Sequence, residues 1–159
     1  MTGIFLVGTI VCFSQEWTSI VPLVSTCDDV KKAFGISECK VPVTRIEKPK
    51  YRITILFTSV DCQCSDKKGS PEWKVPKGTV EFVSVGLYEG IKLSDFKSDL
   101  KNFVRKPVYD LPGDWMYIDM ESGQRLTVHS DEFIQDIYIF PTKRNALRLR
   151  CPSVRPFSL

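Results

Sequence analysis

The chain has 159 residues, of which 43% are hydrophobic and 26% are charged. This composition is typical of a soluble globular domain with one core, and it excludes a disordered or fibrous protein. The formal net charge is only +3, and without a basic stripe through the domain we expect no nucleic-acid binding.

Residues 1–14, "MTGIFLVGTIVCFS", contain an apolar run from Ile4 to Phe13 that is too short to span a bilayer as a helix and ends in Cys12-Phe13-Ser14, which includes two small residues. The run predicts a signal peptide cut near Ser14, although no basic residue precedes it and the true start of the signal stays open. A lipid anchor on Cys12 and a buried native strand are the alternatives. No later segment approaches membrane-spanning length, so we expect a secreted or periplasmic chain.

The next stretch, "STCDDVKKAFG", carries the signals of a short helix over 25–35. Ser25 is expected to cap it, with Asp28 as the carboxylate of a capping box. Val30 and Phe34 share one apolar face, and Gly35 can take the left-handed conformation that ends a helix.

Three strands are predicted to follow. "VTRIEK" (43–48) and "YRITILFTS" (51–59) read as a hairpin that turns at Pro49. A polar loop over 64–78 leads into a third strand, "TVEFVSVGLY" (79–88), whose side chains alternate between two faces.

The same order then recurs. "LSDFKSDLKNFV" (93–104) has apolar residues at helical spacing, "WMYIDM" (115–120) and "QRLTVHS" (124–130) flank a tight turn, and "EFIQDIYIF" (132–140) is a sixth strand. We therefore predict an α+β fold of two α-β-β-β units, 15–90 and 91–159, within one compact domain. The second unit ends in a basic C-terminal tail. Helices should pack on antiparallel sheet, with the two sheets side by side or continuous.

The stretch "PLVSTCDDVKKAFG" (22–35) resembles the opening of small outer-membrane-assembly lipoproteins of the SmpA/OmlA type. Those proteins share a helix followed by three strands, and secreted β-lactamase-inhibitor proteins use related units in tandem. "EWKVPKGTV", "LSDF" and "LRCP" are also similar to uncharacterised secreted bacterial proteins of the same plan. The resemblance implies a non-catalytic scaffold or binding domain and transfers no functional residue.

Residues that could carry catalysis are few. His129 is the only histidine, and in "HSDE" it does not form a triad with its sequence neighbours because adjacent residues of a strand point to opposite sides. No spacing matches an EF-hand, and the glycines do not form a phosphate-binding loop. We therefore expect no enzymatic activity, no cofactor and no metal.

Five cysteines follow the proposed signal peptide, and in an oxidising compartment thiols pair by default. Cys27 and Cys39 bracket the first helix and are predicted to form one disulfide. Cys151 then needs a partner from "CQC". Cys64 is our assignment, yet Cys62 faces the same way on an extended strand, so the choice stays open. A redox or metal-binding protein that uses Cys62 and Cys64 is the alternative of another class.

Two tryptophans, Trp73 and Trp115, lie where loops meet strands, and Arg144 and Arg148 belong to the basic C-terminal segment. These four are the candidate partner-binding residues, although the tryptophans could instead cover the ends of the sheet. The sequence thus predicts a secreted or periplasmic, non-catalytic binding or scaffold domain with an unknown protein partner. An enzyme-inhibitor-like protein is the alternative.

Overall fold

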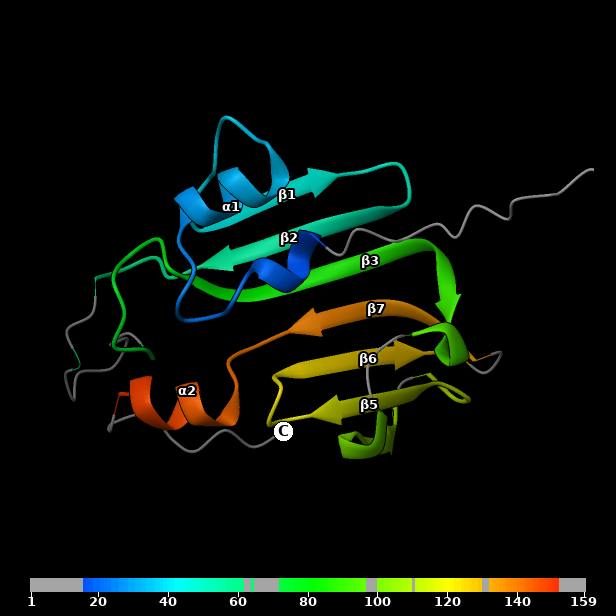
Figure 1. Ribbon diagram of the computed structural model, residues 1–159. Helices are drawn as coiled ribbons and strands as arrows, with labels where there is room; N and C mark the ends of the chain where they lie inside the picture. The colour runs from blue at the N-terminus through cyan, green and yellow to red at the C-terminus, as the bar shows by residue number, and fades with distance from the viewer. Residues whose placement is uncertain are drawn as a thin grey trace, which may run out of the picture.

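The computed structural model describes residues 16–61, 64, 72–96, 100–109, 111–129 and 132–151; the proposed signal peptide lies outside them. The described chain forms one seven-stranded sheet with short helices (Figure 1), and the prediction of an α+β fold is confirmed. The strands are β1 (Val43–Glu47), β2 (Tyr51–Phe57), β3 (Val80–Lys92), β4 (Val104–Pro107), β5 (Trp115–Asp119), β6 (Gln124–Val128) and β7 (Phe133–Ile139). The helices are α1 (Cys27–Phe34) and α2 (Lys143–Leu149), with 3-10 turns η1 (Glu16–Ser19), η2 (Leu93–Asp95) and η3 (Leu100–Asn102).

The strands follow the order β1-β2-β3-β7-β6-β5-β4, and every neighbouring pair is antiparallel. Two meanders therefore meet through β3 and β7, where Val83 lies opposite Ile139 and Val85 opposite Ile137. The sheets of the two halves are continuous. All six strands predicted from the sequence are present.

Helix α1 confirms the predicted helix, but its cap lies one residue later than expected. Thr26 is the N-cap, and its backbone amide donates to Asp29 Oδ2 at 2.7 Å in a capping box. The predicted pair of Ser25 and Asp28 is thus wrong by one position. Gly35 ends the helix with φ of 65°, a conformation that glycine adopts without a Cβ penalty.

Replacing Thr26 with alanine is expected to lower the free energy of unfolding by about 1 kcal/mol, because the capping box loses the hydrogen bond that the Thr26 hydroxyl donates to the Asp29 carboxylate. Urea unfolding followed by circular dichroism measures the effect. Ser37→Ala, at an exposed position beyond the helix, is the control and should leave the midpoint unchanged. Equal midpoints for the two variants would show that the cap does not stabilise α1.

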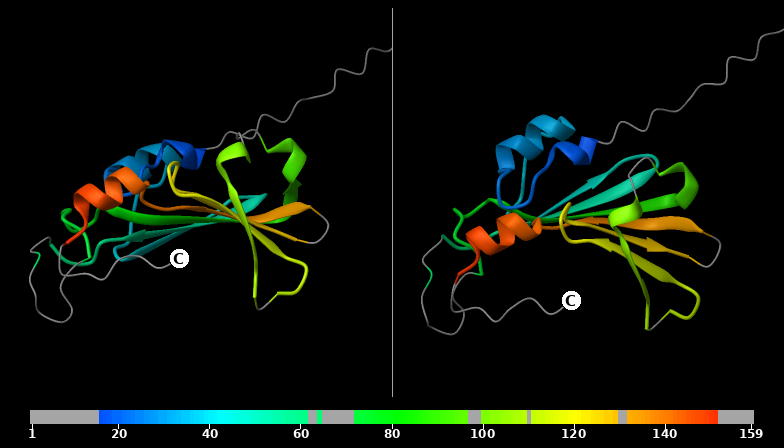
Figure 2. Two further views of the ribbon diagram at one scale, coloured as in Figure 1. Left: turned by 90° about the horizontal axis from the view of Figure 1, so that it is seen from below. Right: turned by 60° about the horizontal axis from the view of Figure 1, so that its bottom comes forward.

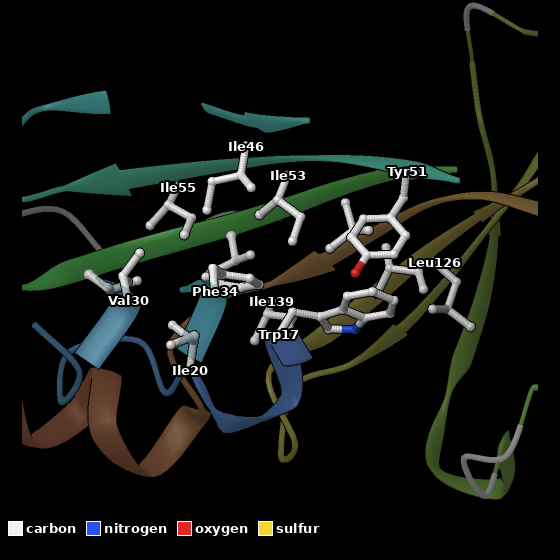
Figure 3. Packing of buried hydrophobic residues seen from close by; sticks show 14 of the residues in the cluster. Trp17, Ile20, Val30, Phe34, Ile46, Tyr51, Ile53, Ile55, Leu126 and Ile139 are labelled. Carbon is white, nitrogen blue, oxygen red and sulfur yellow. The ribbon is translucent and has the colours of Figure 1, made fainter. Parts of the chain in front are cut away.

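The hydrophobic core lies between one face of the sheet and the N-terminal helices. Three side chains from η1 and α1 project onto the sheet: Trp17, Val30 and Phe34. They pack against Ile53 and other apolar residues of β1 and β2 (Figure 3). Trp17 packs edge-on against Tyr51, with ring centroids 5.0 Å apart. Burial of these side chains is the main stabilising term of the fold.

The helix predicted over 93–104 is replaced in the described residues by η2, η3 and the start of β4. Phe96 and Phe103, with Leu93 and Leu100, still pack against the core. A 3-10 turn has three residues per turn, so two such turns also direct residues spaced by three or four to one side. The arrangement of two α-β-β-β units is therefore not confirmed.

The segment predicted as a basic tail instead contains α2. The Thr142 hydroxyl accepts a hydrogen bond from the Asn145 amide at 3.2 Å at the start of the helix. Ala146 and Leu149 then pack on a second, smaller cluster of Leu23, Trp73 and Val75. The C-terminal segment thus adds its own packed layer to the domain.

Two disulfides confirm the expectation of disulfide bonding. Cys27 is bonded to Cys39, across α1, and Cys64 is bonded to Cys151, beyond α2. The second bond decides the open choice in favour of Cys64. The spare thiol predicted for Cys62 lies outside the described residues.

Candidate functional site

The two faces of the sheet are covered unequally. Both α-helices and all three 3-10 turns lie on one side (Figure 2). On β2, Ile53 and Ile55 point to that side and are fully buried, while Arg52 and Leu56 alternate with them. No described helix lies over the opposite side, which we call the open face.

Two unbroken rows of cross-strand neighbours run over the open face, and each row contains one residue from every strand of the sheet. The first row is Glu47, Arg52, Gly86, Asp136, Thr127, Met116 and Lys106. The second is Arg45, Thr54, Ser84, Tyr138, Arg125, Ile118 and Val104. Leu56 and Phe82 form a further pair beside the second row. Polar, aromatic and basic side chains thus dominate a surface that crosses the whole sheet.

Gly86 leaves space in the first row beside its central residue, Asp136. An added Cβ there would lie 3.5 Å from Asp136 Oδ1 and 3.9 Å from Arg52 Nη2. The carboxylate and the guanidinium therefore converge over the glycine. Burial raises the pKa of Asp136, and the positive charges of Arg125 and Arg52 partly oppose this shift.

Replacing Asp136 with asparagine tests this balance. The pKa of Asp136 in the folded chain is above its ordinary value of 3.8. The protonated carboxyl group therefore contributes most to the stability of the fold when the pH is below 3.8, and this contribution is lost as the pH rises through the folded-state pKa. We therefore expect the unfolding free energy of Asp136→Asn, relative to the native chain, to rise between pH 3 and pH 7. Urea unfolding across this range measures the difference. A relative stability that falls with pH would contradict the direction of the shift.

Arg125 lies in the second row beside Tyr138, the central residue of that row. Its guanidinium lies 3.9 Å from the ring centroid of Tyr138, and this ring lies 5.6 Å from that of Phe82. Stacking on an aromatic face holds the guanidinium in place through a cation–π interaction. Within the described part of the chain, the buried Nε of Arg125 has no hydrogen-bond partner.

Beside Arg125 the open face is hollowed. The β4–β5 hairpin bends away from the helices and toward the open side (Figure 2). A cavity of about 250 Å³ lies there, and its lining consists of Lys106, Pro107, Tyr109, Met116, Ile118 and Arg125. One end of the open face is therefore a pocket with two cations and mostly apolar walls.

His129 has a partner that its sequence neighbours do not supply. Its Nδ1 lies 2.6 Å from Oδ1 of Asp114, a side chain only 6% exposed. A buried carboxylate can orient an imidazole in this way for proton transfer. Ser130 and Asp131, which follow it in the sequence, lie outside the described residues, and the expectation of no catalysis stays a prediction.

None of the four candidate partner-binding residues lies in the two rows. Trp73 is 5% exposed, belongs to the cluster beneath α2, and donates from Nε1 to Glu81 at 2.8 Å. This burial favours the alternative that Trp73 is structural. Trp115 is half-buried on the helix side of β5, under the guanidinium of Arg105. Arg144 and Arg148 are exposed on α2, and a role of these residues in partner binding stays a prediction.

Among the described residues, no group of three or more histidine, cysteine or acidic side chains could hold a metal ion. Cys64 is bonded to Cys151, so it has no thiol with which to form a couple with Cys62. The described residues also include no helix with the length and apolarity needed to cross a membrane.

Comparison of the chain with protein-family models, with curated proteins and with solved structures gives no match. The resemblance to the SmpA/OmlA-type lipoproteins therefore stays a prediction.

Proposed function

We propose that the chain is a secreted or periplasmic, non-catalytic binding domain that uses the open face to bind an acidic surface of a partner protein. The observation that supports this most is the pair of cross-strand rows, which present arginine and aromatic side chains on a face without a described helix over it. Arginine, tyrosine and tryptophan are the residues that contribute most to protein–protein binding energy. The two disulfides support an oxidising compartment.

The charges of the open face support an acidic partner. Three carboxylates on or beside it already have neighbours. Glu47 accepts from the Tyr88 hydroxyl, Asp114 contacts His129, and the positive charges of two arginines act on Asp136. Arg45 and Lys106 are exposed near opposite edges of the sheet, where they can attract a negative partner and fix its orientation.

The dimensions also suit a protein surface. Neighbouring strands are about 4.8 Å apart, so a row across the seven strands spans about 29 Å. A standard interface buries about 800 Å² on each partner, equivalent to a patch about 28 Å on a side. If the partner is an enzyme, the chain is an inhibitor, as the alternative from the sequence holds.

Paired charge reversals test which surface binds. We expect Arg45→Glu with Lys106→Glu to reduce at least tenfold the amount of partner captured from the native extracytoplasmic fraction. The matched control, Arg144→Glu with Arg148→Glu, makes the same change of charge on α2 and should leave capture unchanged. Raised salt should weaken capture by the native chain, because exposed charges are screened.

Each outcome of this comparison decides between surfaces. Loss of capture in the open-face variant alone supports the proposal. Loss in the α2 variant alone would assign binding to the basic helix. Equal capture by all three proteins, or none by the native chain, would remove the support for a charge-dependent protein interface.

A further inference from the structure

The cavity beside Arg125 has a floor and walls built by three neighbouring strands. Lys106, Met116, Ile118 and Arg125 come from β4, β5 and β6 and lie in the two rows of the open face. Ile118 is only 7% exposed, whereas Tyr109 at the hairpin is 91% exposed. The cavity therefore has a rigid base on the sheet and an accessible rim.

Arg125 is prepared for a ligand by its surroundings. The ring of Tyr138 lies 3.9 Å from the guanidinium, which limits the freedom of the side chain before anything binds. Its Nε is buried and lacks a hydrogen-bond partner in the described chain. A buried donor without an acceptor is unfavourable, so the described chain does not fully satisfy this guanidinium.

The chemistry of the lining selects the ligand. The fork of N–H groups on a guanidinium matches the two oxygens of a carboxylate, and such charge-assisted bonds are about twice as strong as neutral ones. Lys106 adds a second positive charge, while Met116, Ile118 and Pro107 offer apolar contact. These walls suit a carboxylate on a short hydrocarbon stem better than a polyanion that needs polar contacts on every side.

We propose that this pocket is the anchor of the interface and binds the carboxylate of an acidic side chain of the partner protein. The carboxylate binds the guanidinium of Arg125, Lys106 adds long-range attraction, and the methylenes of the partner side chain contact Met116 and Ile118. This inference rests on the proposed function of the open face. It goes beyond that function because it assigns one pocket and one functional group.

A pair of small probes tests the pocket without the partner. In the full chain, the methyl NMR signals of Met116 and Ile118 are followed during titration with 4-methylpentanoate and, separately, with 4-methylpentanamide. We expect saturable shifts with the carboxylate at about millimolar concentrations, as suits so small a ligand. The neutral amide, which has the same shape, should bind at least tenfold more weakly.

Variants assign the binding to Arg125. Arg125→Met should abolish the carboxylate-dependent shifts, and Arg125→Lys, which keeps the charge but loses the fork, should weaken binding several-fold. Arg45→Met removes a charge from the open face outside the cavity and should leave the titration unchanged. If Arg125→Met does not fold, Arg125→Lys and Lys106→Met still report on the site.

Several results would overturn the inference. Equal binding of acid and amide would mean an apolar pocket without carboxylate recognition, and absence of shifts with both probes would mean no site. Equal loss in Arg45→Met and Arg125→Met would mean a diffuse charge effect. If the pocket binds the carboxylate probe but the open-face charge reversals do not reduce partner capture, only the proposed function is contradicted. If those charge reversals do reduce capture but the pocket shows no preference for the carboxylate, only this inference is contradicted.

Discussion

Replacing Cys64 and Cys151 together with alanine is expected to lower the free energy of unfolding by about 4–5 kcal/mol, because the bond closes a sequence separation of 87 residues in the unfolded chain. Loss of the bond also releases the end of α2. There the Lys74 amide donates to the Leu149 carbonyl at 2.6 Å, and Arg150 pairs with Glu72 at 3.0 Å. Guanidinium unfolding of the oxidised proteins measures the difference.

The matched control for this prediction is the double alanine variant of the other disulfide. Cys27 and Cys39 are separated by only 12 residues, so their removal should lower the free energy by about 3 kcal/mol. The order of the two effects is the test. A larger loss for the shorter separation would contradict the chain-entropy explanation of the Cys64–Cys151 bond.

Replacing Trp73 with alanine is expected to lower the free energy of unfolding by about 3–5 kcal/mol, the usual result of removing a buried aromatic side chain. The ring fills the cluster between Leu23 and α2, and the buried indole N–H donates to Glu81. Thermal and urea unfolding measure the loss. Trp115→Ala should have a smaller effect, because Trp115 is only half-buried.

The outcome for Trp73 decides between its two interpretations from the sequence. A strong loss of stability means that Trp73 belongs to the core. A stable Trp73→Ala variant with weakened partner capture would instead make it a binding residue and would contradict the packing described for α2.

Much of the sheet could be predicted because buried and more exposed side chains alternate along its strands. In β2, buried Ile53 and Ile55 alternate with the more exposed Arg52, Thr54 and Leu56, which gives a period of two. Strand β4 has no such signal, since all four of its residues are exposed at the edge of the sheet. Helix α1 was recognisable from its capping residues and Gly35, although the cap itself was misplaced by one residue.

The C-terminal half was harder to predict for two physical reasons. Apolar residues from Leu93 to Phe103 have helical spacing, yet two 3-10 turns satisfy the same contacts. In α2 the basic residues suggested a solvated tail, and the signal of packing was limited to Ala146 and Leu149. Propensity and charge could not show that these two side chains meet a cluster formed by residues far away in the sequence.

The arrangement of side chains on the open face could not be inferred from the sequence, because alternation separates the two faces of each strand but does not give the order and register in which the strands pair. The neighbours of Arg125 depend on strand register, which places Tyr138 and Ile118 on either side of it. The contact between Asp114 and His129, too, follows from the pairing of β5 with β6. The sequence indicates tryptophans at loop ends as candidate binding residues, whereas the open face is a surface made within the sheet.

The central claim is that the partner binds the open face, and site-specific photocrosslinking tests it most directly. A photoreactive amino acid at Ser84, which lies next to the central Tyr138 of the second row, is compared with one at Lys32, exposed on α1. In the native extracytoplasmic fraction we expect a protein adduct from position 84 that the Arg45→Glu, Lys106→Glu background strongly reduces, and none from position 32. An adduct from position 32 without one from position 84 would contradict the account.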